Sequence, residues 1–466
     1  MKILLVAYDF PPIPSPQSIR WAYLVSSLAR QGHSVHVLTG NVGGFGYGGL
    51  PFIENRVIVH RIFAGVYPYL HSKLFEDPYQ GEFVLEPMRE TWETSEAISV
   101  AEKSLLMQLR SFIRSNRKRE LLANKISLRR RTLSVLKRLF SQVLYPDERG
   151  EWPFFARRKF IKLLEVYRPD IVITSHEPPN SLRLGFLAKK MGTTWVADLG
   201  DPILAPYTPA RWQKKASENE ALVAVHADRI VMTSSDGIEN FVSRQPEVSS
   251  KALLITQGFP QTLRAQPVPC IPTDFFCREK LELLYTGTFY GFRRWDALLE
   301  AVASVKGARL TIATIHPTVE LMEFARNHSR SIRLLGFVPH NVVLELQRRA
   351  DVLINIANDD SVQIPGKFYE YLGSGRPILH LAGPHDTLHT HIESLGVGLS
   401  VVNSKGAIVR ALESLAVRHN LDGLRSFSEN RCESRIIEFS WDSLASRLID
   451  EFNSISSTKD KTQERT

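Results

Sequence analysis

The residues best placed to do chemistry lie in one short stretch, 364–378, which reads IPGKFYEYLGSGRPI. Apolar side chains recur there at helical spacing between a proline–glycine start and a glycine-rich end, so we expect a short helix. A helix N-terminus offers free backbone N–H groups and a positive dipole end, which favour a phosphate. Lys367 adds a cation at this end, and Glu370 lies one turn further, where it can accept hydrogen bonds from a ribose diol. The stretch therefore suits a nucleoside diphosphate.

A second stretch with cations, 284–301, reads LYTGTFYGFRRWDALLEA. An apolar run precedes it, and a helical pattern follows Arg293 and Arg294. A guanidinium binds phosphate in a bidentate manner, so this arginine pair also suits a diphosphate. Both stretches have a plain structural interpretation as well. The first can be an ordinary helix-to-strand turn with an isolated Lys and Glu, and the second a solvated arginine pair that begins a helix.

Polar residues also follow strand-like runs in the N-terminal half. The loop 8–20 reads YDFPPIPSPQSIR and lacks the GxGxxG spacing of a dinucleotide site, which argues against a nicotinamide enzyme. His176 lies in the loop after 170–174, and the stretch 195–202 reads WVADLGDP. A single histidine of this kind is as often a structural residue as a functional one.

The elements that must position these residues alternate between strand and helix. Residues 2–7 form a continuous apolar run, typical of a strand covered on both faces, and a helical pattern and the run 34–39 follow. Such a start implies a parallel sheet with right-handed crossovers. Further strands are expected at 57–61, 170–174, 194–197, 229–233, 251–256, 281–285, 309–314, 332–336, 352–356, 377–381 and 397–401.

The 466 residues exceed one ordinary core, and residues 261–280 hold three prolines and little periodicity, as a linker does. We therefore expect an α/β protein of two Rossmann-like domains facing across a cleft, with the C-terminal helix returning to the N-terminal domain. The expected parts are a domain 1–265 with an insertion at about 70–150, a domain 281–438, a helix 439–455 and a disordered tail 456–466.

Charge is distributed unevenly along the chain. The net charge is +9, yet residues 110–138 hold eleven Lys or Arg and one acid, so the rest of the chain is close to neutral. This segment has the pattern of an amphipathic helix with a basic face, which predicts binding to an anionic membrane surface. It can instead pair with the acidic stretch 76–102 or pack on the first domain with its charges solvated. No nucleic acid partner is expected.

Composition and targeting patterns favour a cytoplasmic protein. Apolar residues make up 43% of the chain and charged residues 23%, and no apolar run approaches the roughly 20 residues of a membrane span. The N-terminal residues show no secretory pattern, and the three cysteines lack CxxC spacing. We expect a cytoplasmic protein, peripheral at the inner face of the membrane through 110–138, with no metal and no cofactor.

The first of these motifs resembles the family 4 retaining glycosyltransferases of the GT-B fold. Glu370 matches the second, ribose-binding glutamate of that family's Glu-x7-Glu motif, whereas the first glutamate falls on Val362. In 284–301, Arg293 takes the place of the family's lysine, and Thr288 takes the place of its arginine. Those cations hold the donor pyrophosphate as it departs. The resemblance implies a donor site formed by Ile364, Pro365, Gly366, Lys367, Glu370, Gly287, Thr288, Arg293, Arg294 and Val338.

The N-terminal motifs resemble the acceptor side of the same family. Its proline-rich first loop implies that Ser15 and Gln17 face the substrates, and its Asp-x-x-Asp-Pro stretch implies the same for Asp198 and Asp201. The histidine after the strand at 170–174 implies an active-site role for His176, so the implied catalytic residues are His176, Arg293 and Lys367.

The resemblance implies a hexosyl- or related transferase that moves a sugar, with retention, from a UDP or GDP sugar to an acceptor hydroxyl. The acceptor is then a glycan or a lipid-linked glycan of polysaccharide or glycolipid assembly. Two other classes remain open. One is a sugar-nucleotide 2-epimerase of the same fold, which needs carboxylates or histidines around the sugar in the first domain. The other is a non-catalytic glycosyltransferase-like binding subunit, which the Val362 and Thr288 replacements keep open.

Overall fold

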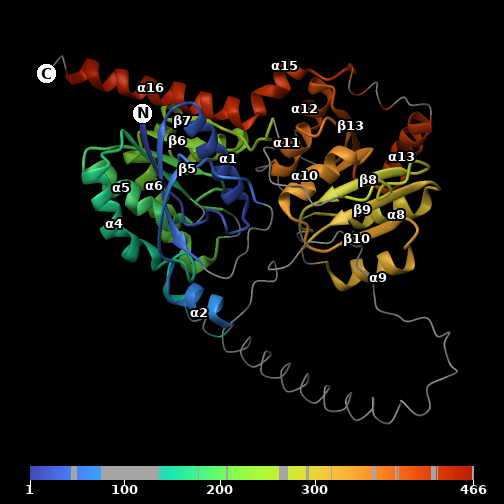
Figure 1. Ribbon diagram of the computed structural model, residues 1–466, viewed down its shortest axis with the longest axis horizontal. Coiled ribbons are helices and arrows are strands. Elements are labelled where there is room, and N and C mark those ends of the chain that lie inside the picture. Colours follow the sequence, from blue (N-terminus) through green and yellow to red (C-terminus); the bar gives the residue numbers. More distant parts are fainter. Residues whose placement is uncertain are drawn as a thin grey trace, which may run out of the picture.

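The computed structural model describes residues 1–42, 50–74, 135, 137–138, 140–176, 178–205, 208–261, 271–289, 293–315, 317–358, 364–383, 386, 388–420, 424, 427 and 429–463. Within them the chain forms two α/β domains, and a long C-terminal helix lies along the first (Figure 1). Among the described helices, none combines the length and hydropathy that a bilayer-spanning segment requires. Most of the predicted insertion, including nearly all of 110–138, lies outside the described residues.

The first domain is built on a seven-stranded parallel sheet with strand order β3-β2-β1-β4-β5-β6-β7. Its strands are β1 (Lys2–Val6), β2 (Ser34–Asn41), β3 (Ile58–Phe63), β4 (Ile171–Ser175), β5 (Thr194–Leu199), β6 (Arg229–Met232) and β7 (Ala252–Leu254). Its helices are α1 (Pro16–Arg30), α2 (Val66–Leu74), α4 (Trp152–Val166), α5 (Leu182–Lys190), α6 (Ala210–His226) and α7 (Ser235–Arg244), with 3₁₀ turns at Pro179–Ser181 and Pro246–Ser250.

The second domain repeats this plan on a six-stranded parallel sheet with strand order β10-β9-β8-β11-β12-β13. Its strands are β8 (Leu281–Thr286), β9 (Ala308–Ala313), β10 (Ile332–Leu335), β11 (Val352–Ile356), β12 (Ile378–Ala382) and β13 (Gly398–Val402). Its helices are α8 (Asp296–Ser304), α9 (Val319–Asn327), α10 (His340–Arg349), α11 (Gly366–Leu372), α12 (Leu388–Leu395), α13 (Lys405–Asn420) and α15 (Glu433–Ile436), followed by a 3₁₀ turn at Ile437–Phe439 and by α16 (Trp441–Gln463).

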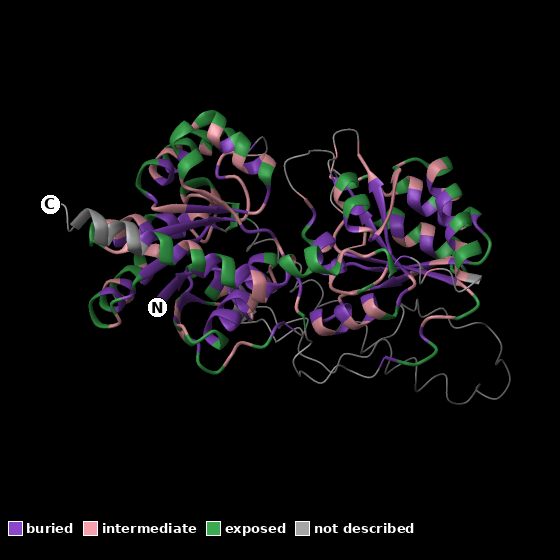
Figure 2. Cartoon of the chain, turned by 90° about the horizontal axis from the view of Figure 1, so that it is seen from above, coloured by how far each residue is buried: buried purple, intermediate pink, exposed green. Residues whose placement is uncertain are grey.

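Helices cover both faces of each sheet, which explains the continuous apolar runs. In β1, Ile3 and Leu5 pack with α1 and α16, while Leu4 and Val6 pack with α4 on the other face. Figure 2 shows buried residues concentrated in the strands and exposed residues on the outer sides of the helices. The fold class predicted from alternating apolar runs, two Rossmann-like domains, is confirmed.

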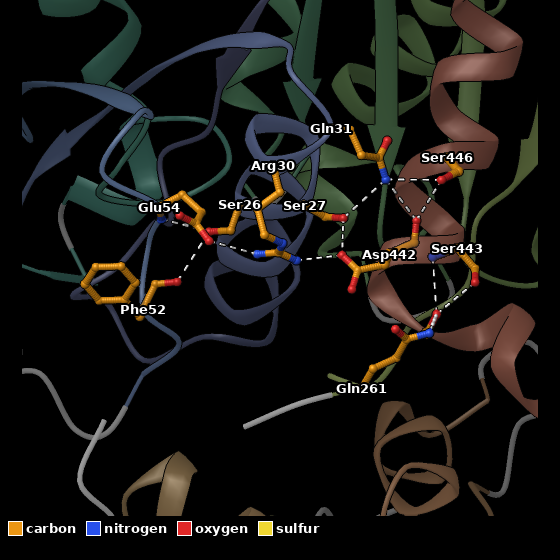
Figure 3. Close-up of polar contacts among 11 residues, drawn as sticks. Ser26, Ser27, Arg30, Gln31, Phe52, Glu54, Gln261, Asp442, Ser443 and Ser446 are labelled. Atoms are coloured by element: carbon orange, nitrogen blue, oxygen red, sulfur yellow. Dashed lines mark hydrogen bonds and ion pairs between the residues drawn. The ribbon is translucent and has the colours of Figure 1, made fainter. Parts of the chain in front are cut away.

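The predicted return of the C-terminal helix to the first domain is also confirmed. Trp441, Leu444 and Phe452 of α16 are buried in the same core as α1. The Asp442 carboxylate accepts hydrogen bonds from Ser27 and, at 2.6 Å, from Arg30 of α1 (Figure 3). The helix is longer than predicted. It continues to Gln463 and so includes part of the stretch 456–466, for which the sequence predicts disorder.

The two chain crossings between the domains run side by side. Phe259 and Ser440 form an isolated parallel bridge, with Phe259 N bonded to the Phe439 carbonyl and Trp441 N bonded to the Phe259 carbonyl. Gln261 Nε2 donates to Ser440 Oγ at 3.2 Å. Part of the predicted linker, 262–270, lies outside the described residues, and the described crossing begins near Phe259.

Candidate functional site

The motif predicted to hold a nucleoside diphosphate lies at the carboxyl edge of the second sheet. In both sheets the strand order reverses beside the first strand, between β1 and β4 and between β8 and β11. Ligands of open parallel sheets bind outside the carboxyl ends of the strands at such a point. Helix α11 follows β11 and carries Lys367 and Glu370 at this edge. The position of the motif is therefore one where a ligand site is expected.

Glu370 lies at the centre of a polar cluster. Its Oε1 accepts hydrogen bonds from Lys367 Nζ at 2.8 Å and from Gln347 Nε2 at 2.5 Å. Its Oε2 lies 3.8 Å from His340 Nδ1. Gln347 Nε2 also donates to Thr286 Oγ1 at 3.2 Å, so the cluster joins α10 and α11 to the end of β8.

The charge state of Glu370 follows from these neighbours. Burial raises the pKa of its carboxyl group most strongly, but Lys367, His340 and Gln347 together outweigh burial and hold the pKa below its usual range. Glu370 is therefore ionised at neutral pH, with only 10% of its side chain exposed. A buried, ionised carboxylate that already accepts hydrogen bonds on one oxygen is well suited to accept more from hydroxyl groups.

The end of β8 is fixed against α11 by Tyr371. The Tyr371 hydroxyl accepts a hydrogen bond from Thr286 N at 3.0 Å and lies 3.1 Å from Thr286 Oγ1. The next residue, Gly287, has a φ of +144°, a conformation that L side chains rarely adopt. The Tyr371 contacts therefore fix the end of β8 beside the Glu370 cluster, just before Thr288 and the arginine pair.

Arg293 lies at the same edge, between β8 and β11. Its Nε donates to Asn358 Oδ1 at 2.8 Å, and its Nη1 lies 3.5 Å from both the Tyr285 hydroxyl and the Thr288 carbonyl. Asn358 directly follows the end of β11. These contacts aim the guanidinium along the strand ends, whereas Arg294 is exposed and its carbonyl accepts from Asn403 at 2.7 Å.

The remaining predicted donor residues surround the start of α11. Pro365 is buried and immediately precedes α11, while Ile364 is half-buried and packs on the core of the second domain. Gly366 opens the helix, and a Cβ built on it meets Gln257 Cγ of the first domain at 3.3 Å. The Val338 side chain is buried in that core, so only its backbone is placed to meet a ligand.

The first sheet presents a polar edge at the equivalent point. Ser15 caps α1 by accepting a hydrogen bond from Ser18 N at 3.1 Å. Gln17 is buried, and a Cβ built on Gly200 falls 1.5 Å from Gln17 Nε2, so only glycine at position 200 leaves space for this amide. The first turn of α1 therefore touches the loop after β5, which brings Gln17 beside the segment that carries Asp201.

Asp198 is bonded inside the first domain. Its side chain is fully buried, with Arg20 Nη2 at 3.1 Å from Oδ1 and Trp21 Nε1 donating to Oδ2 at 3.0 Å. Both carboxylate oxygens are thereby engaged inside the domain. These contacts anchor α1 to β5, because a buried carboxylate needs a paired cation. The expectation that Asp198 faces an acceptor stays a prediction.

His176 and Asp201 lie at the carboxyl edge of the first sheet. The backbone N–H of His176 donates to the Asp198 carbonyl at 2.8 Å, which sets the loop after β4 beside the loop after β5. Burial lowers the pKa of the His176 imidazole to about 4, against the opposing charges of Asp201 and Asp198. His176 is therefore neutral at pH 7, so one of its ring nitrogens can accept a proton and the other can donate one.

Several residues of these two edges were missed by sequence reasoning. His340, Gln347 and Tyr23 contact the Glu370 cluster or each other from distant segments, and no motif marks them. Asp9 and Arg149 form an ion pair of 3.6 Å at the first edge, and burial raises the pKa of the Asp9 carboxyl despite Arg149. The position of Asp9 directly after the first strand was the one available signal.

Among the described residues, no group of three or more His, Cys, Asp or Glu side chains is arranged to hold a metal ion. No protein-family model matches the chain, and no curated protein matches it. Solved structures do match over nearly its whole length.

Three of them illustrate the range. Sucrose-phosphate synthase from Thermosynechococcus elongatus is 14% identical, with 98% of this chain and 100% of that one covered and a TM-score of 0.61. Anabaena HepE in complex with UDP is 11% identical, with 97% and 100% covered and a TM-score of 0.60. A UDP-N-acetylglucosamine 2-epimerase, described as putative, from Listeria monocytogenes is 13% identical, with 98% and 97% covered and a TM-score of 0.53.

At such low identities the likeness establishes architecture rather than activity. The two parallel sheets of seven and six strands, each with its helices, match the two-domain architecture of these structures. The chain therefore has the GT-B fold.

Proposed function

We propose that the protein is a glycosyltransferase that moves a sugar from a nucleoside diphosphate to an acceptor hydroxyl with retention. The observation that carries this proposal is the buried, ionised Glu370 held by Lys367 and Gln347 at the carboxyl edge of the second sheet. A ribose diol supplies the hydroxyl donors that such a carboxylate accepts. Arg293, aimed along the same edge, supplies a cation for the diphosphate.

The chemistry asked of these residues is electrostatic. The bond between the anomeric carbon and the diphosphate oxygen breaks, and its electron pair leaves with the diphosphate. The acceptor oxygen forms the new bond and loses its proton. Arg293 and Lys367 would stabilise the charge on the departing diphosphate, and preorganised cations of this kind are the largest single contribution in many enzymes. Positioning of the two substrates supplies most of the rest.

The donor that we propose is a UDP or GDP sugar, and the comparisons support a nucleotide sugar. HepE of the same fold has been solved with UDP and with UDP-glucose. In our proposal the base meets the backbone near Val338, and the diphosphate meets Gly287, Thr288 and Arg293. Hydroxyl groups of the acceptor, a glycan or lipid-linked glycan of polysaccharide or glycolipid assembly, would approach the first domain.

The polar edge of the first sheet is where we place that acceptor. Gln17 lies there in the first turn of α1, and His176 and Asp201 lie in the loops after β4 and β5. His176 is neutral at pH 7. A neutral imidazole can take the acceptor proton or hold the sugar by hydrogen bonds.

A sugar-nucleotide 2-epimerase is the second candidate. The same edge carries Asp9, whose carboxyl pKa is raised by burial, together with His176 and Asp201. These are the acid–base residue types that proton transfer at a sugar carbon needs. A 2-epimerase is among the solved structures of this fold.

Product analysis with the donor alone and with acceptors separates these functions. The protein is incubated with a set of UDP and GDP sugars, and nucleoside diphosphate release and sugar identity are both measured. A transferase releases the diphosphate, faster when an acceptor is present, and leaves the remaining donor unchanged. Conversion of the donor sugar without release supports the epimerase, and neither reaction with any donor supports a binding subunit.

A further inference from the structure

Tyr23 is the side chain through which the first domain reaches the Glu370 cluster. It belongs to α1, and its hydroxyl lies 3.3 Å from His340 Nε2 at the start of α10 in the second domain. Its ring stacks on Trp441 at the start of α16, with ring centroids 5.7 Å apart and planes 10° apart. One tyrosine thus contacts the second domain with its hydroxyl and the chain crossing with its ring.

His340 connects this tyrosine to the donor carboxylate. Its Nε2 faces Tyr23, and its Nδ1 faces Glu370 Oε2 at 3.8 Å. Burial lowers the pKa of the imidazole to about 4, so one nitrogen carries a proton at pH 7 and the other does not. A carboxylate only accepts, whereas a tyrosine hydroxyl can donate. The consistent arrangement has the proton on Nδ1, toward Glu370, and Nε2 accepting from Tyr23.

The orientation of the Glu370 carboxylate is therefore set from two sides. Lys367 and Gln347 hold Oε1, while His340 faces Oε2. The charge of Glu370 also acts on Tyr23. Burial raises the pKa of the Tyr23 hydroxyl most, and the charge of Glu370 raises it further. Four of the five groups, Glu370 included, belong to the second domain, and Tyr23 alone comes from the first.

The donor helix also packs directly on the crossing. A Cβ built on Gly373, just after α11, meets the Phe259 side chain at 2.5 Å, and the Tyr369 and Phe439 rings lie 5.4 Å apart. Gln257 lies against Gly366 at the other end of the helix. A change in the relative position of the two domains therefore alters the packing of α11. The Tyr23–His340 contact also joins the domains, so it changes with their relative position.

We propose that Tyr23 is a positioning residue that, through His340, sets the Glu370 carboxylate for nucleotide binding when the two domains are in contact. The part that concerns nucleotide rests on the function proposed above, in which Glu370 holds the donor. Because coupling between two binding events is reciprocal, the domain contact strengthens nucleotide binding and nucleotide strengthens the domain contact by the same factor. A site confined to the second domain would show no such dependence on Tyr23.

The hydrogen-bond arrangement is tested first, without any ligand. Protein labelled with ¹⁵N-histidine is examined by NMR at pH 7, and the His340 signals are identified by their loss in His340→Asn. We expect His340 as the Nδ1–H tautomer in the wild type and a mixture of tautomers in Tyr23→Phe, which removes only the hydroxyl. A wild-type Nε2–H tautomer, or no change in Tyr23→Phe, overturns the proposal.

Nucleotide binding is tested second, by calorimetric titration with UDP and with GDP. Tyr23→Phe loses one hydrogen bond that orients the site. We therefore expect its nucleotide affinity to be about two- to tenfold lower than that of the wild type. Tyr167→Phe is the matched control, because its hydroxyl bonds the Ser34 carbonyl at 2.6 Å in the first domain, away from Glu370. It should bind as the wild type does.

A double-mutant cycle separates a relay from two unrelated effects. If Tyr23 acts through His340, Tyr23→Phe adds little to the loss caused by His340→Ala, and His340→Asn, which keeps a donor near the Nδ1 position, restores part of the affinity. Additive losses, or unchanged affinity in Tyr23→Phe, contradict the proposal. If the wild type binds neither nucleotide, the proposed function fails, and the tautomer measurement decides the Tyr23–His340 contact on its own.

Discussion

At the residue scale, the site depends on cations that look alike in the sequence but differ in the structure. Arg293 is fixed along the strand ends by Asn358, whereas the neighbouring Arg294 is exposed. We expect Arg293→Ala to lower kcat/KM for the donor by roughly 10- to 100-fold, since a lost charge-assisted contact costs about 1.5–3 kcal/mol. Arg294→Ala is the matched control and should change kcat/KM less than threefold. Equal losses in both variants would contradict the assignment of Arg293.

Buried histidines give the protein a predictable pH dependence. Burial lowers the pKa of His176 to about 4, so between that value and its ordinary pKa of 6.5 the unfolded chain binds more protons than the folded one. The stability associated with neutral His176 is therefore complete above pH 6.5 and is lost as the pH falls toward 4. We expect His176→Asn to flatten the fall of the unfolding free energy in this window, measured by urea denaturation. The exposed His389→Asn should leave the slope as in the wild type.

The candidate site could be predicted from the sequence only where its residues are neighbours in the chain. Lys367 and Glu370 lie one helical turn apart, so the pair was visible as a motif. Gln347 and His340 reach the same carboxylate from α10, and Tyr23 of α1 reaches His340; only the sheet topology brings these residues together. For the same reason, the sequence does not show that Arg20 and Trp21 enclose Asp198.

At the element scale, α16 belongs to the first domain through its apolar face more than through its polar contacts. Phe452 is fully buried, so Phe452→Ala should lower the unfolding free energy by about 3–5 kcal/mol. Asp442 and Arg30 form a half-exposed pair, so Asp442→Ala should cost less than about 1 kcal/mol. Thermal or chemical unfolding of the two variants measures both. A larger loss for Asp442→Ala would show that the polar contacts of Figure 3 hold the helix.

Central strands such as β4 and β11 could be predicted well because they are covered on both faces and are therefore mostly apolar. The end of α16 could not, because a helix satisfies its own backbone hydrogen bonds even where its side chains are polar. The turn after β5 shows a third limit. Gly200 matters because Gln17 lies against it, and a sequence without structure gives no sign of that approach.

At the scale of the whole molecule, the basic segment 110–138 predicts where the protein works. Each Lys or Arg near an anionic bilayer contributes about 1 kcal/mol, so a few engaged residues give reversible attachment. We expect co-sedimentation with vesicles that contain anionic lipid, weakened by salt and reduced when Arg129, Arg130 and Arg131 become Ser. Vesicles of neutral lipid are the control. Equal pelleting with both vesicle types, or with neither, would count against membrane attachment.

The two domains share a strand order, yet they present different chemistry at the same topological point. The second sheet offers Glu370, Lys367 and Arg293, whereas the first offers Gln17, His176 and the Asp9–Arg149 pair. A cation-rich edge suits a nucleoside diphosphate, and a mixed polar edge suits a hydroxyl-rich acceptor. This difference between the two edges is the physical reason why we propose the second domain for the donor and the first domain for the acceptor.

The central claim is that the site around Glu370 binds a nucleoside diphosphate. Calorimetric titration of UDP and GDP tests it most directly. We predict saturable binding of at least one of them at a single site, weakened about tenfold or more in Glu370→Gln. Glu345→Gln is the matched control, because Glu345 forms an exposed helical pair with Arg349, and it should bind as the wild type does. Binding of neither nucleotide by the wild type, or equal affinity in Glu370→Gln, would contradict the account.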